Sequence, residues 1–214
     1  MDTFVLDTNT FFNMEAGFSL GKKTEEVIKN LTEKIKKLKK QGKAVFYMPP
    51  SVVDEFFSFF EDKNQQFIKE FLSIVNIQSP EKHRINFSAP SFYKLIAEIR
   101  ERSYRGMNIA EEEIVNSINF ILKNPPKDKI DFQKKTGIFI KKFRERYRKA
   151  TREKILDSVA DLDLIVLAKE KDGFLVTSDE GVIIWARELG VKEMPSVAFL
   201  KRLEFLLLPH QEQD

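Results

Sequence analysis

The chain is predicted to fold as an α/β domain, with a central parallel sheet flanked by helices, that carries an all-helical insertion. Two observations predict this class. Short apolar runs rich in β-formers alternate with segments of helical periodicity toward both ends of the chain. Between about residues 81 and 150 only helical periodicity remains. We therefore expect residues 1–80 and 151–214 to form the α/β domain and residues 81–150 to form the insertion.

The first part of the α/β domain is predicted from apolar spacing and from the residues that end each run. In residues 24–40 the apolar residues recur every three or four positions and lysines fill the other face, which indicates an amphipathic helix. Pro49 and Pro50 end the following apolar run. The predicted elements are strands at 3–6, 44–48 and 73–77 and helices at 24–40, about 51–61 and 64–72.

The insertion and the last part of the chain follow by the same criteria. We predict two insertion helices, one ending near Arg105 and Gly106 and one ending before Pro125, and a third helix from about Asp131. The α/β alternation then resumes. Its predicted elements are a helix at 158–171, a strand at 174–177, a helix at 181–189 and a strand at 191–194.

Composition narrows the class of protein. The chain has 214 residues, of which 42% are hydrophobic, enough for a sizeable core. No apolar run approaches the roughly 20 residues of a membrane span. The chain begins with a strand-like segment and an acidic residue, so no signal peptide is expected. The absence of cysteine excludes disulfides, zinc–thiolate sites and thiol nucleophiles. We expect a soluble cytoplasmic protein without a membrane partner.

The net charge of +3 conceals a strong local imbalance. Residues 134–154 contain ten Lys or Arg and two Glu, whereas the rest of the chain contains 26 basic and 31 acidic residues. Such an imbalance favours contact with a phosphate backbone over a merely solvated face. The interleaved apolar residues have helical spacing and are expected in a core or an interface. The predicted RNA-binding residues are Lys141, Lys142, Arg144, Arg146, Arg148, Lys149 and Arg152, with a second patch of Arg100, Arg102 and Arg105.

Acidic residues follow several of the predicted strands. Asp7 ends the first strand run, Glu55 lies early in the helix after the second, and Asp179 follows the last long strand run. The carboxyl ends of parallel strands meet at one edge of a sheet, where ligands bind. Carboxylates gathered there repel each other unless a cation offsets their charge, and hard divalent cations prefer such oxygen ligands. We predict metal binding by Asp7, Asp157, Asp161 and Asp179, with Asp163 and Glu55 as further catalytic residues.

Five of these six acidic residues also have a purely structural interpretation. Asp7 could form an Asx-turn or a cap, and Asp179 could begin a helix. Asp161 could share a capping box with Ser158. Asp163 could be a solvated residue or a hydrogen-bond partner, and Glu55 could be an ordinary surface glutamate. The joint position of the five is a stronger signal than any one of them.

Other reaction classes lack their residues. None of the eight glycines forms a phosphate-binding loop, which argues against an NTPase. A phosphatase of the haloacid-dehalogenase type needs a second aspartate two positions after Asp7, and that position is Asn9. His83 and His210 are the only histidines and are expected at the surface.

The acidic set resembles that of the PIN-domain ribonucleases. This family has a first strand ending in Asp-Thr/Ser-Asn/Ser, a glutamate after the second strand, a Ser-x-x-Asp helix start and a late Thr-x-Asp. The resemblance covers residues 1–80 and 155–200 and implies a three-layer PIN-like fold. Its motifs are met by Asp7-Thr8-Asn9, Glu55, Ser158, Asp161, Thr177 and Asp179.

A narrower resemblance spans nearly the whole chain. The opening Met-Asp-Thr-Phe-Val-Leu-Asp-Thr, the Phe-Tyr-Met-Pro, the helical insertion and the Asp-Ser-Val-Ala-Asp-Leu-Asp run are similar to the minimal protein-only RNase P family called HARP, also labelled RNA ligase partner proteins. This resemblance implies removal of the 5′ leader from precursor tRNA without an RNA subunit. It also implies a homo-oligomer, built from dimers into a dodecamer.

The resemblance further implies Mg²⁺, with Mn²⁺ as an expected substitute. Thr8, Asn9, Ser158 and Thr177 would then position the carboxylates. Two alternatives stay open. A toxin-type PIN nuclease is disfavoured by the long insertion, and a non-catalytic RNA-binding partner protein is disfavoured by the complete acidic set. Surplus residues among the 20 phenylalanines are expected in subunit contacts.

Overall fold

A computed structural model describes residues 1–12, 21, 23–156 and 158–208. The chain divides into two compact units. The α/β unit comprises Met1–Phe87 with Lys154–Asp214, and the hairpin unit comprises Ser88–Glu153. Residues 81–87, which the sequence assigned to the insertion, therefore belong to the α/β unit.

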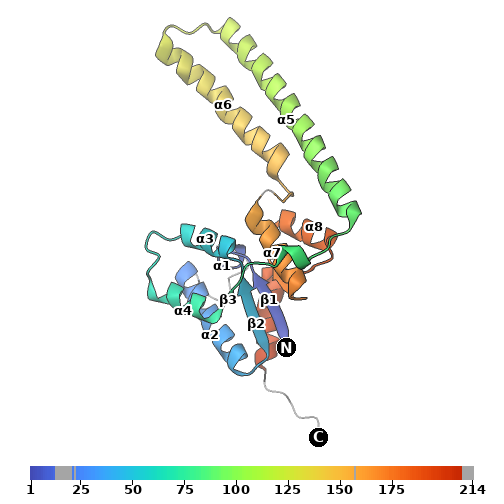
Figure 1. The fold of residues 1–214 in the computed structure, drawn as a ribbon. Helices are drawn as coiled ribbons and strands as arrows, with labels where there is room; N and C mark the ends of the chain where they lie inside the picture. The colour runs from blue at the N-terminus through green and yellow to red at the C-terminus, as the bar shows by residue number, and fades with distance from the viewer. Residues whose placement is uncertain (13–20, 22, 157, 209–214) are drawn as a thin grey trace. The chain divides into compact units, whose positions relative to one another are not determined.

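Within the described residues the α/β unit has one five-stranded sheet in which every neighbouring pair is parallel (Figure 1). Phe4, Val5 and Leu6 point alternately to opposite faces of the sheet, and all three are fully buried. Both faces are therefore covered, as expected for a parallel sheet. The predicted fold class is confirmed. The strand order is β3-β2-β1-β4-β5, with β1 Asp2–Leu6, β2 Ala44–Met48, β3 Asn76–Ile77, β4 Phe174–Val176 and β5 Lys192–Met194.

Helices form the outer layers of this unit. Helix α2 contacts α4, α9 and β2, whereas α7 contacts α8, β1 and β4. Helix α9 was not predicted, although its buried residues Phe199, Leu200 and Leu203 have helical spacing. The helices of the unit are α1 Asn9–Phe12, α2 Thr24–Lys40, α3 Pro50–Ser58, α4 Gln66–Ile74, α7 Val159–Glu170, α8 Glu180–Glu188 and α9 Ser196–Leu207, with a 3₁₀ turn, η1, at Lys82–Arg84.

Chain order reverses at β1, because β2 lies on one side of it and β4 on the other. The carboxyl ends of all the strands lie at one edge, since all are parallel. Helix α7 leads into β4 through three residues, so its carboxyl end lies at the opposite edge. Its 12 residues span about 18 Å. The amino end of α7 therefore returns to the edge where the strands end.

One predicted strand is shorter than expected. Ser73 and Ile74 form the end of α4, and only Asn76–Ile77 pairs with β2. Apolar residues continue from α4 into β3 with only Ser73 and Asn76 between them, and so short a stretch does not distinguish a buried helix from a strand. The buried face of α4, with Phe67, Ile68 and Phe71, takes the first part of the run.

Aromatic residues fill much of the core, as the sequence predicted. The ring of Phe4 stacks on Phe46, with centroids 5.4 Å apart, and meets Phe199 edge-on at 5.1 Å. A second cluster joins α1, α3 and α4 through edge-on contacts of Phe11 with Phe56 and Phe71. These contacts fix α1 and α3, which both follow strand ends.

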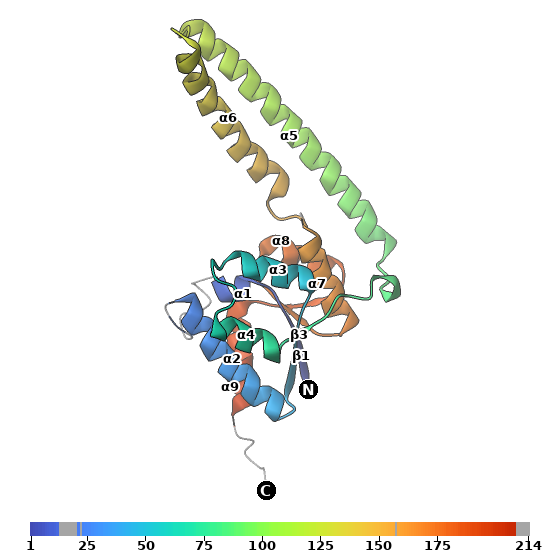
Figure 2. The ribbon, with the colours of Figure 1, turned by 60° about the vertical axis from the view of Figure 1, so that its left-hand side comes forward.

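The hairpin unit consists of two long helices, α5 Ala89–Lys123 and α6 Lys129–Arg152, which pack side by side (Figures 1 and 2). The prediction of a break near Arg105 and Gly106 is wrong, because α5 is continuous. A Cβ atom on Gly106 would lie 2.7 Å from the ring of Tyr147 and 3.1 Å from Thr151. Gly106 thus serves the close approach of α6 and does not end a helix.

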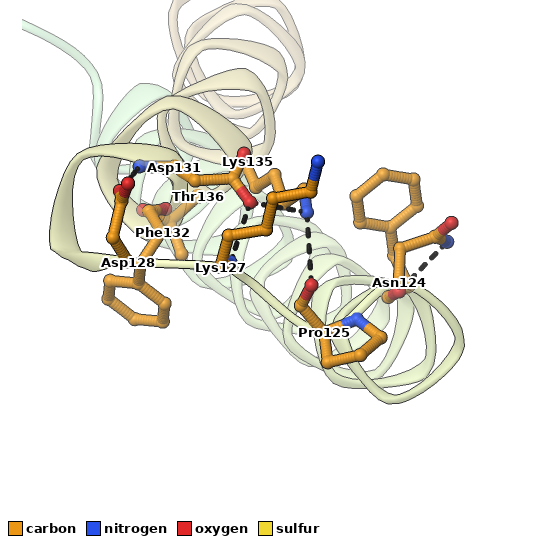
Figure 3. A network of polar contacts seen from close by, with 9 residues as sticks. Asn124, Pro125, Lys127, Asp128, Asp131, Phe132, Lys135 and Thr136 are labelled. Atoms are coloured by element: carbon orange, nitrogen blue, oxygen red, sulfur yellow. Dashed lines mark hydrogen bonds and ion pairs between the residues drawn. The ribbon is translucent and has the colours of Figure 1, made fainter.

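Polar contacts fix the turn between the two helices (Figure 3). The carboxylate of Asp128 caps α6 by accepting from the backbone N–H of Asp131, at 2.7 Å. Asp131 in turn accepts from the backbone N–H of Lys127 at 3.0 Å and from Nζ of Lys135 at 2.7 Å. The Lys135 ammonium and these hydrogen bonds hold the pKa of Asp131 below its usual value.

The hairpin has almost no apolar core of its own. No residue of α6 is buried, and the buried residues of α5 are Ser91, Arg102, Gly106 and Glu113. Large apolar side chains lie exposed along both helices, for example Ile114, Ile118 and Ile140. None of the helices in the described ranges has the length and apolar content needed to cross a membrane.

Candidate active site

Asp7 is the most buried carboxylate of the predicted site. It follows β1 directly, with 3% of its surface exposed. Its Oδ1 accepts from Thr8 Oγ1 at 3.2 Å, and its Oδ2 accepts from Asn9 Nδ2 at 3.1 Å. The backbone N–H of Asn9 lies 3.5 Å from Oδ1, in the arrangement of an Asx-turn. Burial raises the pKa of Asp7 even though these hydrogen bonds oppose the shift.

Asp7 is linked to the loop after β4 through Thr177. The fully buried Thr177 hydroxyl donates to Asp7 Oδ2 at 2.5 Å and accepts from the backbone N–H of Asp179 at 3.0 Å. Asp179 Oδ1 caps α8 by accepting from the N–H of Val182 at 2.9 Å. The expected structural role of Asp179 as a helix cap is therefore present. This cap uses Oδ1 of Asp179, which leaves Oδ2 available for the predicted metal binding.

Glu55 lies beside Asp7 although it is far from it in sequence. Partial burial of its carboxyl group, and next the charge of Asp7, raise the pKa of Glu55, while a hydrogen bond with Thr8 opposes the shift. The backbone of Glu55 is placed by Pro50, which begins α3, and by the packing of Phe56 on Phe11. Two carboxylates thus share the Thr8 side chain and repel each other.

The helix start that follows Asp157 also has the expected cap. Ser158 Oγ accepts from the backbone N–H of Asp161 at 3.0 Å, as in a capping box. Asp161 lies in the first turn of α7, where the helix dipole favours an anion. Asp157 lies outside the described residues. Asp163, two residues after Asp161, is bonded elsewhere, to Ser51 and Lys82.

The donor set fits a hard divalent cation, because the candidate ligands are carboxylates and two of them adjoin with raised pKa values. The described residues do not complete such a site. Among them no group of three or more His, Asp or Glu side chains lies close enough to hold a metal ion. Asp157, the remaining predicted ligand, lies outside those residues.

The family model described as a PINc domain ribonuclease matches residues 3–208. The chain belongs to this PINc domain ribonuclease family. Proteins named RNA-free ribonuclease P are similar to it over most of its length. The one from Pyrococcus furiosus is 35% identical, covering 97% of this chain and 95% of the relative. Those from Thermodesulfovibrio yellowstonii and Nitrosococcus oceani are 36% and 34% identical, covering 88% and 90% of this chain and 86% and 89% of the relatives.

Membership in the PINc domain ribonuclease family makes this chain an endoribonuclease of the PIN type. PIN-domain nucleases are generally metal-dependent, which is the role that the sequence predicted for the acidic cluster. The identity of the ligands and of the metal stays a prediction.

The predicted RNA-binding residues of the hairpin fall into two groups. Some are already used inside the hairpin. Arg102 is 9% exposed and donates to Glu98 and to the carbonyl of Glu153. Arg146 pairs with Glu112 and Glu113, and Lys142 pairs with Glu113 at 3.1 Å. Arg105 makes an exposed pair with Glu101, and Arg100 lies 5.8 Å from the Tyr104 ring.

The second group lines an open groove on α6. Lys141, Arg144 and Arg148 lie along it with Gly137 and Ile140. Lys149 and Arg152 lie in the last turn of the same helix. An RNA-contacting role for all of these residues stays a prediction. The groove is lined by Glu145 as well as by the three cations.

Ser51 and Lys82, the partners of Asp163, were not predicted as site residues. Ser51 lies one turn before Glu55 on α3, which is a weak signal that spacing alone could have given. Lys82 belongs to a polar segment between the predicted strand and the insertion. Nothing in its spacing connects it to α7.

Proposed function

We propose that this protein is an RNA-free ribonuclease P, which removes the 5′ leader from precursor tRNA as an endonuclease and needs no RNA subunit. The observation that carries the proposal is similarity to proteins of that name over nearly the whole chain, hairpin included. The buried carboxylate at the end of β1, linked to the loop after β4, supports hydrolysis at this edge of the sheet.

In this proposal Asp7, Asp157, Asp161 and Asp179 hold Mg²⁺, with Mn²⁺ as a substitute, and Glu55 completes the acidic cluster. A bound divalent ion would supply a nucleophilic hydroxide near neutral pH and offset charge on the phosphate. Thr177 and Asn9 hold the two oxygens of Asp7 in a fixed orientation. The Ser158 cap fixes the backbone that presents Asp161. Asp163 was predicted as a further catalytic residue, and both of its oxygens are bonded to Ser51 and Lys82.

The substrate would be held by positive charge on the hairpin. Folded RNA is recognised largely through phosphates, 2′-hydroxyls and shape. The groove of Lys141, Arg144 and Arg148 offers cations without a base-reading loop, which suits that mode. Arg100, Arg105, Lys149 and Arg152 extend the proposed contact surface. The internal pairs of Arg102, Lys142 and Arg146 give these three residues a structural role in addition to any RNA contact.

We also propose a homo-oligomer, with dimers assembling into a dodecamer. Support comes from the exposed apolar side chains of the hairpin, which include Ile114, Ile118, Leu122 and Ile138. The hairpin has no apolar core in which these side chains could be buried. A subunit interface would bury them. A cytoplasmic location, where precursor tRNA is processed, and the absence of a membrane partner are part of the same proposal.

The test uses purified protein, Mg²⁺ and a tRNA precursor with a 5′ leader, and the cut is mapped at nucleotide resolution. We expect one cut at the mature 5′ end, leaving a 5′-phosphate on the tRNA. Asp7→Asn should remove the activity, whereas Asp54→Asn, a matched change at the exposed neighbour of Glu55, should keep it. Cuts at many sites in unrelated RNA would favour a toxin-type nuclease. Binding without any cut would favour a non-catalytic partner protein.

A further inference from the structure

Asp163 is a buried carboxylate whose two oxygens both have partners. It is 8% exposed. Its Oδ2 accepts from Ser51 Oγ at 3.0 Å, and its Oδ1 lies 2.9 Å from Nζ of Lys82. A buried carboxylate that loses its cation and its hydrogen bond is strongly unfavourable. The Lys82 side chain is itself 59% exposed, so the pair lies where the buried carboxylate meets the surface. The three residues join three segments of the chain.

Two of these segments carry proposed active-site carboxylates. Ser51 lies one turn before Glu55 on α3, and Asp163 lies two residues after Asp161 on α7. Residues two apart on a helix point to different faces, so Asp163 cannot share the direction of Asp161. The bond from Ser51 to Asp163 instead joins α3 to α7. It is one of the contacts between α3 and α7, the helices that present Glu55 and Asp161.

The third segment leads from β3 toward the hairpin. Lys82 lies in η1, and its neighbours are also bonded to α7 or to the residues next to it. The backbone N–H of Glu81 donates to Glu170 at 2.7 Å, and Gln78 Nε2 donates to the same carboxylate at 3.3 Å. The ammonium of Lys169 lies 5.3 Å from the ring of Phe87. Lys82 is the contact of this segment nearest the amino end of α7.

We propose that Lys82 is a positioning residue of the nuclease site that acts through Asp163. The ion pair keeps the Asp163 carboxylate directed at Ser51, and it thereby holds α3 and α7 at the spacing that Glu55 and Asp161 need. The proposal rests on the function proposed above for this site. In this proposal Asp163 supports the acidic cluster and pairs with Lys82. The metal ion is bound by the other carboxylates.

Lys82→Met keeps most of the side-chain stem and removes the charge. It therefore distinguishes the positioning role from metal binding by Asp163 and from a phosphate contact by Lys82. We expect the single-turnover cleavage rate to fall roughly 10- to 100-fold, as for a small misplacement of catalytic groups. The Mg²⁺ concentration for half-maximal rate should rise, because Asp161 is a proposed ligand, whereas the dissociation constant for precursor tRNA should stay unchanged. Lys82→Arg should restore most of the rate, and Ser51→Ala should reproduce the loss in part.

Other outcomes would overturn the proposal. Asp163 would be a metal ligand if Lys82→Met lowered the Mg²⁺ requirement, because the mutation would free a carboxylate for the ion. Lys82 would be a phosphate contact if the mutation weakened tRNA binding and reduced its salt dependence. An unchanged rate would show that the ion pair is dispensable.

A second measurement does not depend on activity. Since the chain has no cysteine, spin labels can be placed by Asp54→Cys on α3 and Leu162→Cys on α7, both at exposed positions. We expect one narrow distance distribution in the parent protein and a broader or shifted one with Lys82→Met. An unchanged distribution would reject the positioning role. An inactive parent protein whose distribution responds to Lys82→Met would reject the proposed function and keep the structural bridge.

Discussion

The two units of the chain differ in how much apolar surface they bury. In the α/β unit the strands and helices bury apolar side chains on both faces of a sheet, and Phe4, Phe46 and Phe199 are completely inaccessible. In the hairpin the longest helices of the protein meet with little apolar burial, and α6 has no buried residue. Apolar burial is the main favourable term in folding. The α/β unit can therefore be stable by itself, whereas the hairpin needs polar contacts and a covering surface.

The same contrast applies to the carboxylates that each unit buries. Asp7 is buried next to Glu55, no Lys or Arg among the described residues forms an ion pair with it, and burial raises its pKa. Glu113 is buried on the hairpin beside Arg146 and Lys142, and these cations lower its pKa. An uncompensated carboxylate favours binding of a cation, and a compensated one stabilises the fold. The difference separates the residues expected to work on the substrate from those expected to hold the structure.

The largest expected effect is the loss of the uncompensated carboxylate. Asp7→Asn should lower single-turnover cleavage by roughly a thousandfold or more, since a catalytic metal contributes several kcal/mol to the barrier. Precursor binding, measured by filter retention in Ca²⁺, should change little because the hairpin is intact. Full cleavage by Asp7→Asn in Mg²⁺ would show that the site assignment is wrong.

The raised pKa of Asp7 also predicts how stability changes with pH. Its folded-state pKa lies above the ordinary value of 3.8, so the folded state holds the proton more tightly than the unfolded state. In metal-free buffer this contribution is complete below pH 3.8 and is lost as pH rises through the folded-state pKa. Near neutral pH Asp7→Asn should therefore unfold at a higher temperature than the parent, and saturating Mg²⁺ should reverse that order. A metal-independent order would contradict the site.

The next effect concerns the proposed subunit interface on the hairpin. Ile114→Glu with Ile118→Glu places charge on the exposed apolar side of α5, and we expect the assembly to dissociate. Light scattering should show a mass well above that of a dimer for the parent and a smaller mass for the variant. Accurate processing should be lost even though the acidic cluster is unchanged, because one subunit would cut while a neighbour's hairpin holds the tRNA. A fully active and accurate monomer would rule this out.

Much of the α/β unit could be predicted because its signals are local. Short apolar runs predicted most of the strands, and polar residues after the first and fourth runs marked the edge where Asp7 and Asp179 lie. Contacts between distant residues could not be predicted in this way. The bridge from Ser51 through Asp163 to Lys82 depends on which helices pack together, and spacing carries no information on that. Gly106 shows the same limit, since the ring of Tyr147 explains it and local helix propensity does not.

The hairpin should respond to a change at its compensated carboxylate. Arg146→Met leaves Glu113 with Lys142 alone, and we expect faster hydrogen exchange in α5 and α6 with little change in the α/β unit. The pKa of Glu113 is depressed from its ordinary value of 4.5, so its contribution is present above pH 4.5 and is lost as pH falls through the folded-state pKa. The difference between variant and parent should shrink across that acidic range. Lys149→Met, a charge removal in the last turn of the same helix, is the control.

The smallest expected effect separates the free cations of the hairpin from those used in its structure. Arg144→Gln and Arg148→Gln should weaken precursor binding without changing thermal stability, because both line the open groove. Each lost phosphate contact should reduce the slope of log affinity against log salt by roughly 0.7–0.9. Arg102→Gln removes the same charge from a buried guanidinium, so it should disturb hydrogen exchange in the hairpin first. Including Arg146 in a triple change would mix the two effects, since that residue also supports Glu113. An unchanged salt slope in the double variant, with the hairpin intact, would show that the groove is a solvated face and that the RNA is held elsewhere.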